Sequence, residues 1–257
     1  MEPPLGSTRS IAARFGALAH DPGRVLLEGL HPLKHALRFG ATVELAVSPD
    51  PAALLALARE LCPDLLATLG ALLQPVPASL FAALAAPPPS PVLAIARRPA
   101  ADAAALLEAP GPAPLVLLDR PVHTGNLGAV VRVAAALGAA GVVCRGGPDP
   151  WAPSALRGSS GLHFALPVVR LDDLPARLGR PLLALHPEGR PLRPGDLAAG
   201  AVLAFGSERH GLDPALRGRA EALLSIPMRA GVSSLNLATA AAIALWVARG
   251  ALPSAGG

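Results

Sequence analysis

Three short stretches in the second half of this 257-residue chain carry side chains whose types and spacing could do chemistry. In the first, residues 119–132 (DRPVHTGNLGAVVR), Asn126 stands as the expected N-cap of a helix and Arg132 follows six residues later. Both side chains can reach the N-terminal side of that helix, because helical side chains lean towards it. Gly128 would let another group approach the first turn. Ordinary roles compete with this interpretation, since Asn often caps helices and Arg is often a surface charge.

The second stretch, residues 203–212 (LAFGSERHGL), begins as an apolar strand and continues through small residues to Glu208 and His210. Small residues at the end of a strand, here Gly206 and Ser207, allow a ligand to pack against the backbone. Glu208 could orient a basic side chain, and His210 could act as an acid or a base. Taken singly, each of the two is more commonly an exposed loop residue.

The third stretch, residues 225–246 (SIPMRAGVSSLNLATAAAIALW), leads into an expected apolar helix over 235–249. Ser233 or Ser234 could cap that helix, and free N–H groups at a helix start bind anions and carboxylates well. Capping by a serine leaves Asn236 unexplained, because a polar amide at the start of a buried helix needs a hydrogen-bond partner.

The elements that must position these stretches alternate between apolar strands and helices, which is typical of a mostly parallel α/β sheet covered on both faces. Ligands bind outside the carboxyl ends of the strands in such sheets, and each stretch follows one such end. The expected strands are Leu115–Asp119, Gly141–Arg145, Ala165–Leu171, Pro181–His186, Ala201–Gly206 and Ala222–Ile226. The expected helices are Leu127–Gly138, Asp172–Leu178, Asp213–Ala220 and Leu235–Arg249.

The first half of the chain shows a similar alternation in the segments RVLLEGL, HPLKHALRFG, TVELAVS and PAALLALAREL. A Pro-rich stretch at residues 85–91 (AAPPPSP) opens a junction that extends to about residue 112. The strand-like segment PVLAIARR lies in this junction and could belong to the first unit. We therefore expect two α/β units.

Composition narrows the class of protein. The chain is 52% apolar with a net charge of +4, which permits a polyanionic partner without requiring one. Cys62 and Cys144 stand in no metal-binding pattern and predict buried, reduced thiols.

The N-terminus has no apolar signal-peptide region and the longest apolar run is too short for a membrane span, so we expect a cytoplasmic protein. A nicotinamide-dependent oxidoreductase is disfavoured because GxGxxG and the ribose-binding acid are missing.

Taken together, NLGAVVR, FGSERHGL and IPMRAGVSSLNLATAAAI resemble the three motifs of the SpoU (TrmH-like) RNA 2′-O-ribose methyltransferases of the SPOUT superfamily, over about residues 115–250. The segment LLEGLHPLKHALRFG is similar to the start of an L30e-like RNA-binding domain. The resemblance implies a smaller L30e-like α/β domain at residues 11–98 and a parallel-sheet SPOUT domain at 112–257. It also implies a deep trefoil knot around S-adenosylmethionine (SAM) and a homodimer through the knot. General topology rules argue against knots, so the knot rests on the resemblance alone.

The resemblance also assigns roles to the motif residues. Arg132 would lie near the ribose 2′-hydroxyl and help to accept its proton, although a guanidinium normally stays protonated and a positioning role is physically safer. Asn126 would hold the ribose or phosphate, and Glu208 would orient Arg132. Ser234 and Asn236 would complete the site. The cofactor-binding residues would be Gly206, Ile226, Met228, Gly231, Leu235 and Asn236. No metal is expected, because a sulfonium is already a good electrophile.

The implied substrate is RNA. An L30e-like domain favours ribosomal RNA of the large subunit (23S) over transfer RNA, and the motifs name neither the molecule nor the nucleotide. A non-catalytic RNA-binding protein on the same fold is the alternative from another class, but it would need a broken motif. The expected RNA contacts are Arg14, Lys34, Arg38 and Arg209, with Arg24, His35, Arg97 and Arg98 as further basic candidates.

Overall fold

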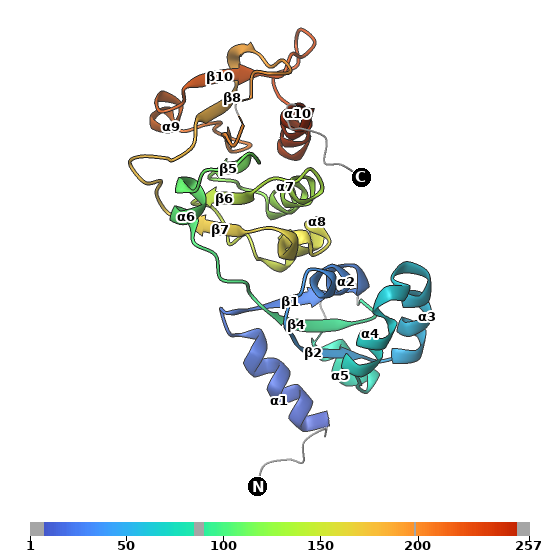
Figure 1. Cartoon of the computed structure of the whole chain (residues 1–257). Helices are drawn as coiled ribbons and strands as arrows, with labels where there is room; N and C mark the ends of the chain where they lie inside the picture. The colour runs from blue at the N-terminus through green and yellow to red at the C-terminus, as the bar shows by residue number, and fades with distance from the viewer. Residues whose placement is uncertain (1–7, 85–89, 198, 251–257) are drawn as a thin grey trace. The chain divides into compact units, whose positions relative to one another are not determined.

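The computed structural model describes residues 8–84, 90–197 and 199–250, and Figure 1 shows its elements. The chain divides into two compact units. The first comprises the residues up to Pro99 together with Ser160–Ala165, and the second comprises Ala100–Ser159 and the chain from Leu166 onwards. Most of the Pro-rich stretch that predicted the junction, residues 85–89, lies outside the described residues.

The first unit is built on a four-stranded sheet in the order β1 (Arg24–Glu28), β4 (Leu93–Arg97), β2 (Val43–Ser48) and β3 (Leu73–Pro75). β4 comes from the segment PVLAIARR, so that segment belongs to the first unit. This sheet is mixed, unlike the parallel sheet predicted for the second unit. β4 lies between β1 and β2 and is antiparallel to both, whereas β2 and β3 are parallel.

Helices surround this sheet, and its core holds Phe15, Leu45, Phe81 and Ile95. The helices of the unit are α1 (Thr8–Ala19), α2 (Leu30–Arg38), α3 (Pro51–Leu61), η1 (Pro63–Leu65), α4 (Leu66–Leu72), α5 (Ala78–Leu84) and η2 (Leu162–Ala165). η2 packs against α2 although more than 120 residues separate them. At this contact a Cβ on Gly161 would come within 2.6 Å of Pro32 Cα, so only glycine fits.

The second unit contains a six-stranded sheet in the order β10-β8-β9-β5-β6-β7, which Figure 1 shows with β10 at one edge and β7 at the other. Every neighbouring pair is parallel, which confirms the predicted parallel α/β sheet. Chain order runs outwards from β5 to β7 on one side and crosses to the other side at β8, with β9 beside β5, so the sheet has a topological switch point between β5 and β9. The strands are β5 (Leu115–Asp119), β6 (Gly141–Arg145), β7 (Val168–Leu171), β8 (Leu182–Pro191), β9 (Val202–Phe205) and β10 (Ala222–Ser225).

The helices of the second unit are α6 (Ala103–Glu108), α7 (Thr124–Ala136), α8 (Pro153–Ser159), α9 (Pro214–Gly218) and α10 (Leu237–Gly250). α7 packs against α8 and α10 (Figure 1). A Cβ on Gly128 would come within 2.2 Å of the Ala155 carbonyl oxygen. The group that approaches the start of α7 at Gly128 is therefore the backbone of α8. None of the helices in the described residues is long and apolar enough to cross a membrane.

Several predicted boundaries differ from the structure. The helix predicted over Asp172–Leu178 is wrong: these residues form bends and coil, and Pro175 disfavours a helical conformation in the residue before it. The sequence predicted no helix where α8 lies, and β7 starts three residues late because η2 occupies the start of the expected strand. Asp213 caps α9 by accepting from Ala215 N at 2.8 Å, so the predicted helix there is confirmed in a shorter form.

Candidate active site

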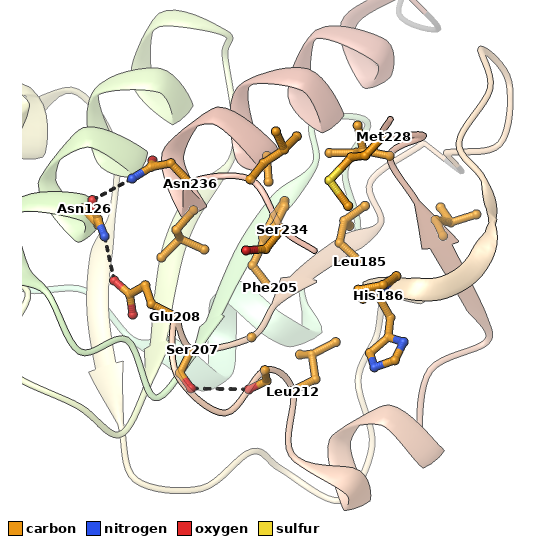
Figure 2. Close-up of a pocket in the computed structure, with 18 of the residues that line it drawn as sticks. Asn126, Leu185, His186, Phe205, Ser207, Glu208, Leu212, Met228, Ser234 and Asn236 are labelled. Atoms are coloured by element: carbon orange, nitrogen blue, oxygen red, sulfur yellow. Dashed lines mark hydrogen bonds between the residues drawn. The ribbon is translucent and has the colours of Figure 1, made fainter. Parts of the chain in front are cut away.

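A cavity of about 590 Å³ opens at the carboxyl edge of the second sheet, and Figure 2 shows its lining. Residues of β8, the ends of β9 and β10 and the segments that follow these two strands line it, together with the first turns of α7 and α10. This volume lies in the range of small-molecule sites, roughly 300–1,000 Å³. Asn126, Glu208 and Asn236 gather at one end, and Leu185, His186 and Met228 lie at the other (Figure 2).

Three side chains at the first end form a hydrogen-bonded bridge, which we name the bridging triad: Asn126, Glu208 and Asn236. Asn236 Nδ2 donates to Asn126 Oδ1 at 3.0 Å, and Asn126 Nδ2 donates to Glu208 Oε1 at 2.9 Å (Figure 2). Each member comes from a different one of the three stretches singled out in the sequence. The fold thus joins segments that are 82 and 110 residues apart.

Glu208 carries the negative charge of the triad. Its carboxylate also accepts from the backbone N–H groups of Val122 at 3.0 Å and His123 at 3.4 Å. Partial burial alone would raise the pKa of Glu208, but the bonds from Asn126 and these N–H groups outweigh it, so the pKa lies below its usual value. Glu208 therefore stays ionised at neutral pH and fixes the loop before α7.

The amide of Asn236, which the sequence left without an assigned partner, is hydrogen-bonded in the structure. Its Oδ1 accepts from Ala238 N at 2.8 Å and from Thr239 N at 3.4 Å, while its Nδ2 bonds Asn126. Asn236 therefore caps α10, and the prediction that Ser233 or Ser234 does so is wrong. The Asn236 side chain therefore bonds two N–H groups that have no partner within the helix and also bonds Asn126 on α7.

The prediction that Asn126 is an N-cap is also wrong. α7 begins two residues earlier, and its N-cap is His123, whose side chain makes no capping hydrogen bond. Asn126 lies in the first turn, so its amide is available for the bridging triad. The sequence suggested a later start because Gly125, in the first turn of α7, is a poor helix former.

The loop after β9 turns back on itself and presents Glu208 at its tip. Ser207 and Gly211 exchange backbone hydrogen bonds of 3.0 Å in both directions. A Cβ on Gly206 would lie 2.1 Å from the carbonyl carbon of Gly211, so this tight turn requires glycine. His210, which the sequence offered as an acid or a base, is exposed and is not among the described residues that line the cavity.

Most residues assigned to the cofactor lie in this cavity. The lining includes Asn126, Gly206, Glu208, Ile226, Met228, Ser234, Leu235 and Asn236. Among the assigned residues of the described second unit, Gly231, Arg132 and Arg209 lie outside the lining. Gly231 is an exposed turn residue with φ +88°, and Arg132 is exposed on α7. The roles given to these residues stay predictions.

Two basic candidates of the first unit already have partners, and a third is buried. Arg38 holds Asp64 with two bonds of 2.6 and 2.9 Å, and Arg14 donates to the Glu44 carbonyl oxygen at 2.8 Å. Lys34 is only 9% exposed. Their assignment to RNA stays a prediction.

Sequence reasoning missed two histidines of the cavity, His123 and His186. His186 Nδ1 accepts from Glu188 N at 3.2 Å, and its Nε2 lies 3.3 Å from Arg217 Nη1. His123 lies in the loop after β5, and His186 ends the strand predicted at residues 181–186, although β8 continues to Pro191. The rule that selected Asn126 and Glu208 would have found them.

It also missed a second polar group at the same edge, which we name the ion cluster: Asp119, Arg120, Arg145 and Asp213. Asp119 is 1% exposed and accepts from Arg145 Nε at 2.8 Å and from Asp213 N at 2.7 Å. Arg120 and Arg145 reach Asp213 at 2.9 and 3.3 Å. The N–H of Ala215 and the Arg145 guanidinium hold the pKa of Asp213 below its usual value despite some desolvation. Two positive and two negative charges balance, so the cluster is a structural brace.

The described part of the chain offers no side-chain group suited to a metal ion, and its thiol in β6 is poorly suited to act as a nucleophile. No group of three or more His, Cys, Asp or Glu residues that could hold a metal ion is found there. Cys144 is buried in β6, and burial raises the pKa of its thiol to about 12, which makes it a poor nucleophile.

Comparison with known proteins agrees with this fold. The model of the SpoU rRNA Methylase family matches residues 113–246, which is more than half of the chain, and the chain belongs to that family. A 23S rRNA uridine 2′-O-methyltransferase of Streptomyces viridochromogenes is 36% identical over 146 residues, or 52% of this chain. The 23S rRNA guanosine 2′-O-methyltransferase RlmP of Bacillus subtilis is 33% identical over 143 residues. The matches span only 51% and 58% of these two relatives.

Solved structures extend the likeness to nearly the whole chain. The SpoU methyltransferase AviRb from Streptomyces viridochromogenes, in complex with AdoMet, superposes with a TM-score of 0.75 at 29% identity. That match covers 93% of this chain and 96% of AviRb. An AdoMet-bound rRNA methyltransferase from Sinorhizobium meliloti gives a TM-score of 0.74 at 27% identity and covers 96% of this chain. The SPOUT-type α/β fold is thereby confirmed.

Proposed function

We propose that this protein is a SAM-dependent RNA 2′-O-ribose methyltransferase that acts on ribosomal RNA. The observation that carries the proposal is the bridging triad, because three motif segments far apart in sequence meet at one end of a single cavity. The AdoMet-bound SpoU structures of similar fold support SAM as the cofactor. The relatives that modify 23S rRNA support the substrate class.

The residues present fit SAM. The cavity is lined by apolar side chains suited to an adenine ring, among them Leu185, Leu212, Leu224 and Ile226, and it is wide enough for a molecule of this size. Gly206 keeps the wall of the cavity free of a side chain at the turn after β9. Backbone groups near Gly206, Ile226, Met228 and Leu235 would hold the cofactor, with Gly231 in the turn that leads to them.

In this proposal the chain supplies position and charge. SAM, when bound, supplies a methyl group on a positively charged sulfur. Asn126 holds the target ribose, Ser234 and Asn236 complete the pocket, and Glu208 keeps Asn126 in place. Arg132 orients the 2′-hydroxyl from the same helix as Asn126. Alignment of nucleophile and methyl carbon is the main contribution that such a site can make.

The choice of RNA is assigned to the first unit, read as an L30e-like domain at residues 11–98. Arg38 shares its charge with Asp64 and Arg14 is hydrogen-bonded to Glu44. Arg209 is exposed and follows Glu208 of the bridging triad directly in the chain. Transfer RNA is the alternative substrate, and work on ribosomal RNA would be done in the cytoplasm.

We also propose a homodimer through the knot region. Trp246 on α10 is 67% exposed, and Val232 and Leu235 before that helix are 48% and 37% exposed. Exposed apolar side chains of this size are suited to a protein interface. Sedimentation that finds a monomer at micromolar concentration would contradict the dimer.

The experiment measures methyl transfer from labelled SAM to bulk ribosomal RNA and to bulk transfer RNA, each digested to nucleosides and resolved by mass spectrometry. We expect a 2′-O-methylnucleoside in the ribosomal fraction and none when Arg132→Ala replaces the wild type, with SAM affinity within a few-fold. Calorimetry should detect binding of SAM and no binding of NAD. SAM binding without transfer to free RNA or ribosomal particles would favour the non-catalytic RNA-binding alternative, and no SAM binding would refute the enzyme.

A further inference from the structure

The basic side chains of the first unit fall into two groups with different surroundings. Lys34 and His35 lie in the middle of α2, where η2 and the residues just before it pack against this helix. Lys34 is 9% exposed, and one ring nitrogen of His35 lies 2.7 Å from the Ser160 carbonyl oxygen. The protein itself therefore covers this part of α2.

The second group gathers at one end of the first sheet, and we name it the Glu44 cluster: Arg14, Arg24, Glu44 and Arg97. The Glu44 carboxylate on β2 accepts from Arg24 Nε on β1 at 2.8 Å and from Arg97 Nε on β4 at 2.5 Å. Arg14 Nη2 on α1 donates to the Glu44 carbonyl oxygen at 2.8 Å. The bonds from Arg24 and Arg97 hold the pKa of Glu44 below its usual value, so its carboxylate stays ionised and fixes both guanidinium groups.

The Glu44 cluster keeps spare positive charge and spare donors. Its only further carboxylate among the described residues is Asp21, which pairs with Arg24, so guanidinium groups outnumber carboxylates here. The side chain of Arg97 is 66% exposed, and its two terminal nitrogens have no partner in the described part of the chain. Arg14 is also exposed. Guanidinium groups with free donors bind phosphate oxygens well.

An exposed aromatic ring lies close to the Glu44 cluster. Phe39 follows α2 directly and is 50% exposed, whereas Phe15 and Phe81 of the same unit are each 3% exposed. The Arg97 N–H donates to the Thr42 carbonyl oxygen at 2.9 Å. Thr42 comes three residues after Phe39, and three residues of extended chain span at most about 11 Å. The backbone of Phe39 therefore lies within that distance of a residue bonded to Arg97.

The turn that carries Phe39 is fixed by its own hydrogen bonds. The Phe39 N–H donates to the His35 carbonyl oxygen at 3.0 Å, and the Ala41 N–H donates to the Ala36 carbonyl oxygen at 2.9 Å. Gly40 between them has φ +74°, which is typical of the glycine that ends a helix. An aromatic side chain on a fixed backbone loses little freedom when it binds a partner.

We propose that Phe39 and the Glu44 cluster bind a single-stranded part of the RNA, with an unpaired base stacked on the Phe39 ring and nearby phosphates held by Arg14 and Arg97. This inference rests on the proposed function. Sites for single strands combine aromatic side chains, on which bases stack, with positive groups that contact the phosphates. Neighbouring bases cover the base faces in a duplex, so only an unpaired base can stack on Phe39.

The first test measures binding of the full chain to a short single-stranded RNA of mixed sequence and to its duplex with the complementary strand, by fluorescence anisotropy. We expect Phe39→Ala to bind the single strand about 5- to 150-fold more weakly, the range that base–aromatic stacking supplies, and to bind the duplex like wild type. Phe39→Trp should keep the affinity, whereas Phe39→Leu, which is apolar but has no ring, should lose it. Thermal denaturation should show that all these variants fold like wild type.

The comparison at Phe39 separates stacking from a plain apolar contact. Wild-type affinity of Phe39→Leu for the single strand would overturn the stacking role. The exposed ring would then be better explained as a contact with a protein partner.

The arginines are tested through the dependence of RNA affinity on salt. Each phosphate contact to a single strand contributes about 0.7 to the slope of log K against log salt concentration, so Arg97→Gln should reduce the slope by about this amount. Arg177→Gln is the matched control, because it removes the same charge from an exposed position in the second unit, between β7 and β8. Equal slopes of the two variants would overturn the phosphate contact.

Methyl transfer separates this inference from the proposed function. With bulk ribosomal RNA as the substrate, Phe39→Ala should raise the KM for RNA, while SAM affinity measured by calorimetry stays within a few-fold of wild type. A Phe39→Ala variant with wild-type KM and wild-type affinity for the single strand would refute the RNA surface and leave the proposed function intact. A wild type that binds single-stranded RNA through Phe39 but binds no SAM would refute the proposed function and leave the RNA surface standing.

Discussion

The ion cluster and the bridging triad lie at the same sheet edge but differ in burial and in charge balance. The ion cluster is buried around Asp119, balances its charges and directs its hydrogen bonds inwards. The bridging triad lines a cavity with Glu208 and Asn236 exposed and Asn126 half-buried, carries one negative charge and joins two amides that can still bond a ligand. A closed, neutral group fixes backbone positions, whereas an open group with spare donors and acceptors is suited to chemistry.

The two groups also act on the same segment from opposite ends. Asp119 ends β5 and anchors the loop before α7 at its start, while Glu208 binds the N–H groups of Val122 and His123 near its end. Arg120 lies between them with a backbone φ of +49°, a conformation that residues other than glycine rarely adopt. The surrounding bonds must stabilise that conformation, so the ion cluster supports the geometry on which the bridging triad depends.

The largest effect on stability is expected for Asp119→Asn. Removing this buried charge leaves Arg145 short of a partner, and breaking a buried pair costs about 3 kcal/mol or more of unfolding free energy. Chemical denaturation measures it. The matched control is Asp172→Asn, because Asp172 pairs with Arg170 but its side chain is 82% exposed. A loss no greater than in the control would show that the ion cluster is not a brace.

Asn236→Ala should act mainly on activity. The variant loses the bond to Asn126 and the cap of α10, so we expect methyl transfer to fall about a hundredfold, or ~2.7 kcal/mol in the transition state. Loss of the cap should cost only about 1 kcal/mol of stability. SAM affinity should fall as well. Ser233→Ala serves as the control beside it, and equal activity of the two variants would contradict the role of the triad.

Acidification should destabilise the ion cluster through protonation of Asp213. The pKa of Asp213 is lowered in the folded protein, chiefly by the Ala215 N–H, so its contribution to stability is complete above the unfolded pKa of about 4. That contribution is lost as pH falls through the folded pKa. Urea midpoints measured between about pH 6 and 2 should fall below about pH 4, and Asp213→Asn should flatten this part of the curve. An unchanged curve would refute the linkage.

The smallest effect is expected for Arg120→Ala. Its guanidinium is 52% exposed and reaches Asp213 at 2.9 Å, and exposed pairs contribute less than about 1 kcal/mol. A loss of stability within that limit, with methyl transfer near the wild-type rate, would show that the stabilising effect of the ion cluster comes from the buried pair Asp119–Arg145. A large loss of transfer would instead make Arg120 part of the site.

Much of the second unit was predictable from sequence because its strands are apolar throughout and its motifs are local. β5 and β6 have the predicted ends, and Asn126, Glu208 and Asn236 were selected from three separate loops. The errors have physical causes. Pro175 breaks an apparently helical segment, and α7 begins before the residue that resembled a cap.

The sequence by itself determined the fold class of the second unit, the motif residues and the need of Asn236 for a partner. Only the tertiary structure decided that this partner is Asn126, that Asn236 caps α10, and that His123 lines the cavity in place of His210. Periodicity and motif spacing describe neighbours along the chain. Contacts across 82 or 110 residues depend on strand order and on where each helix starts, and the packed sheet alone sets these.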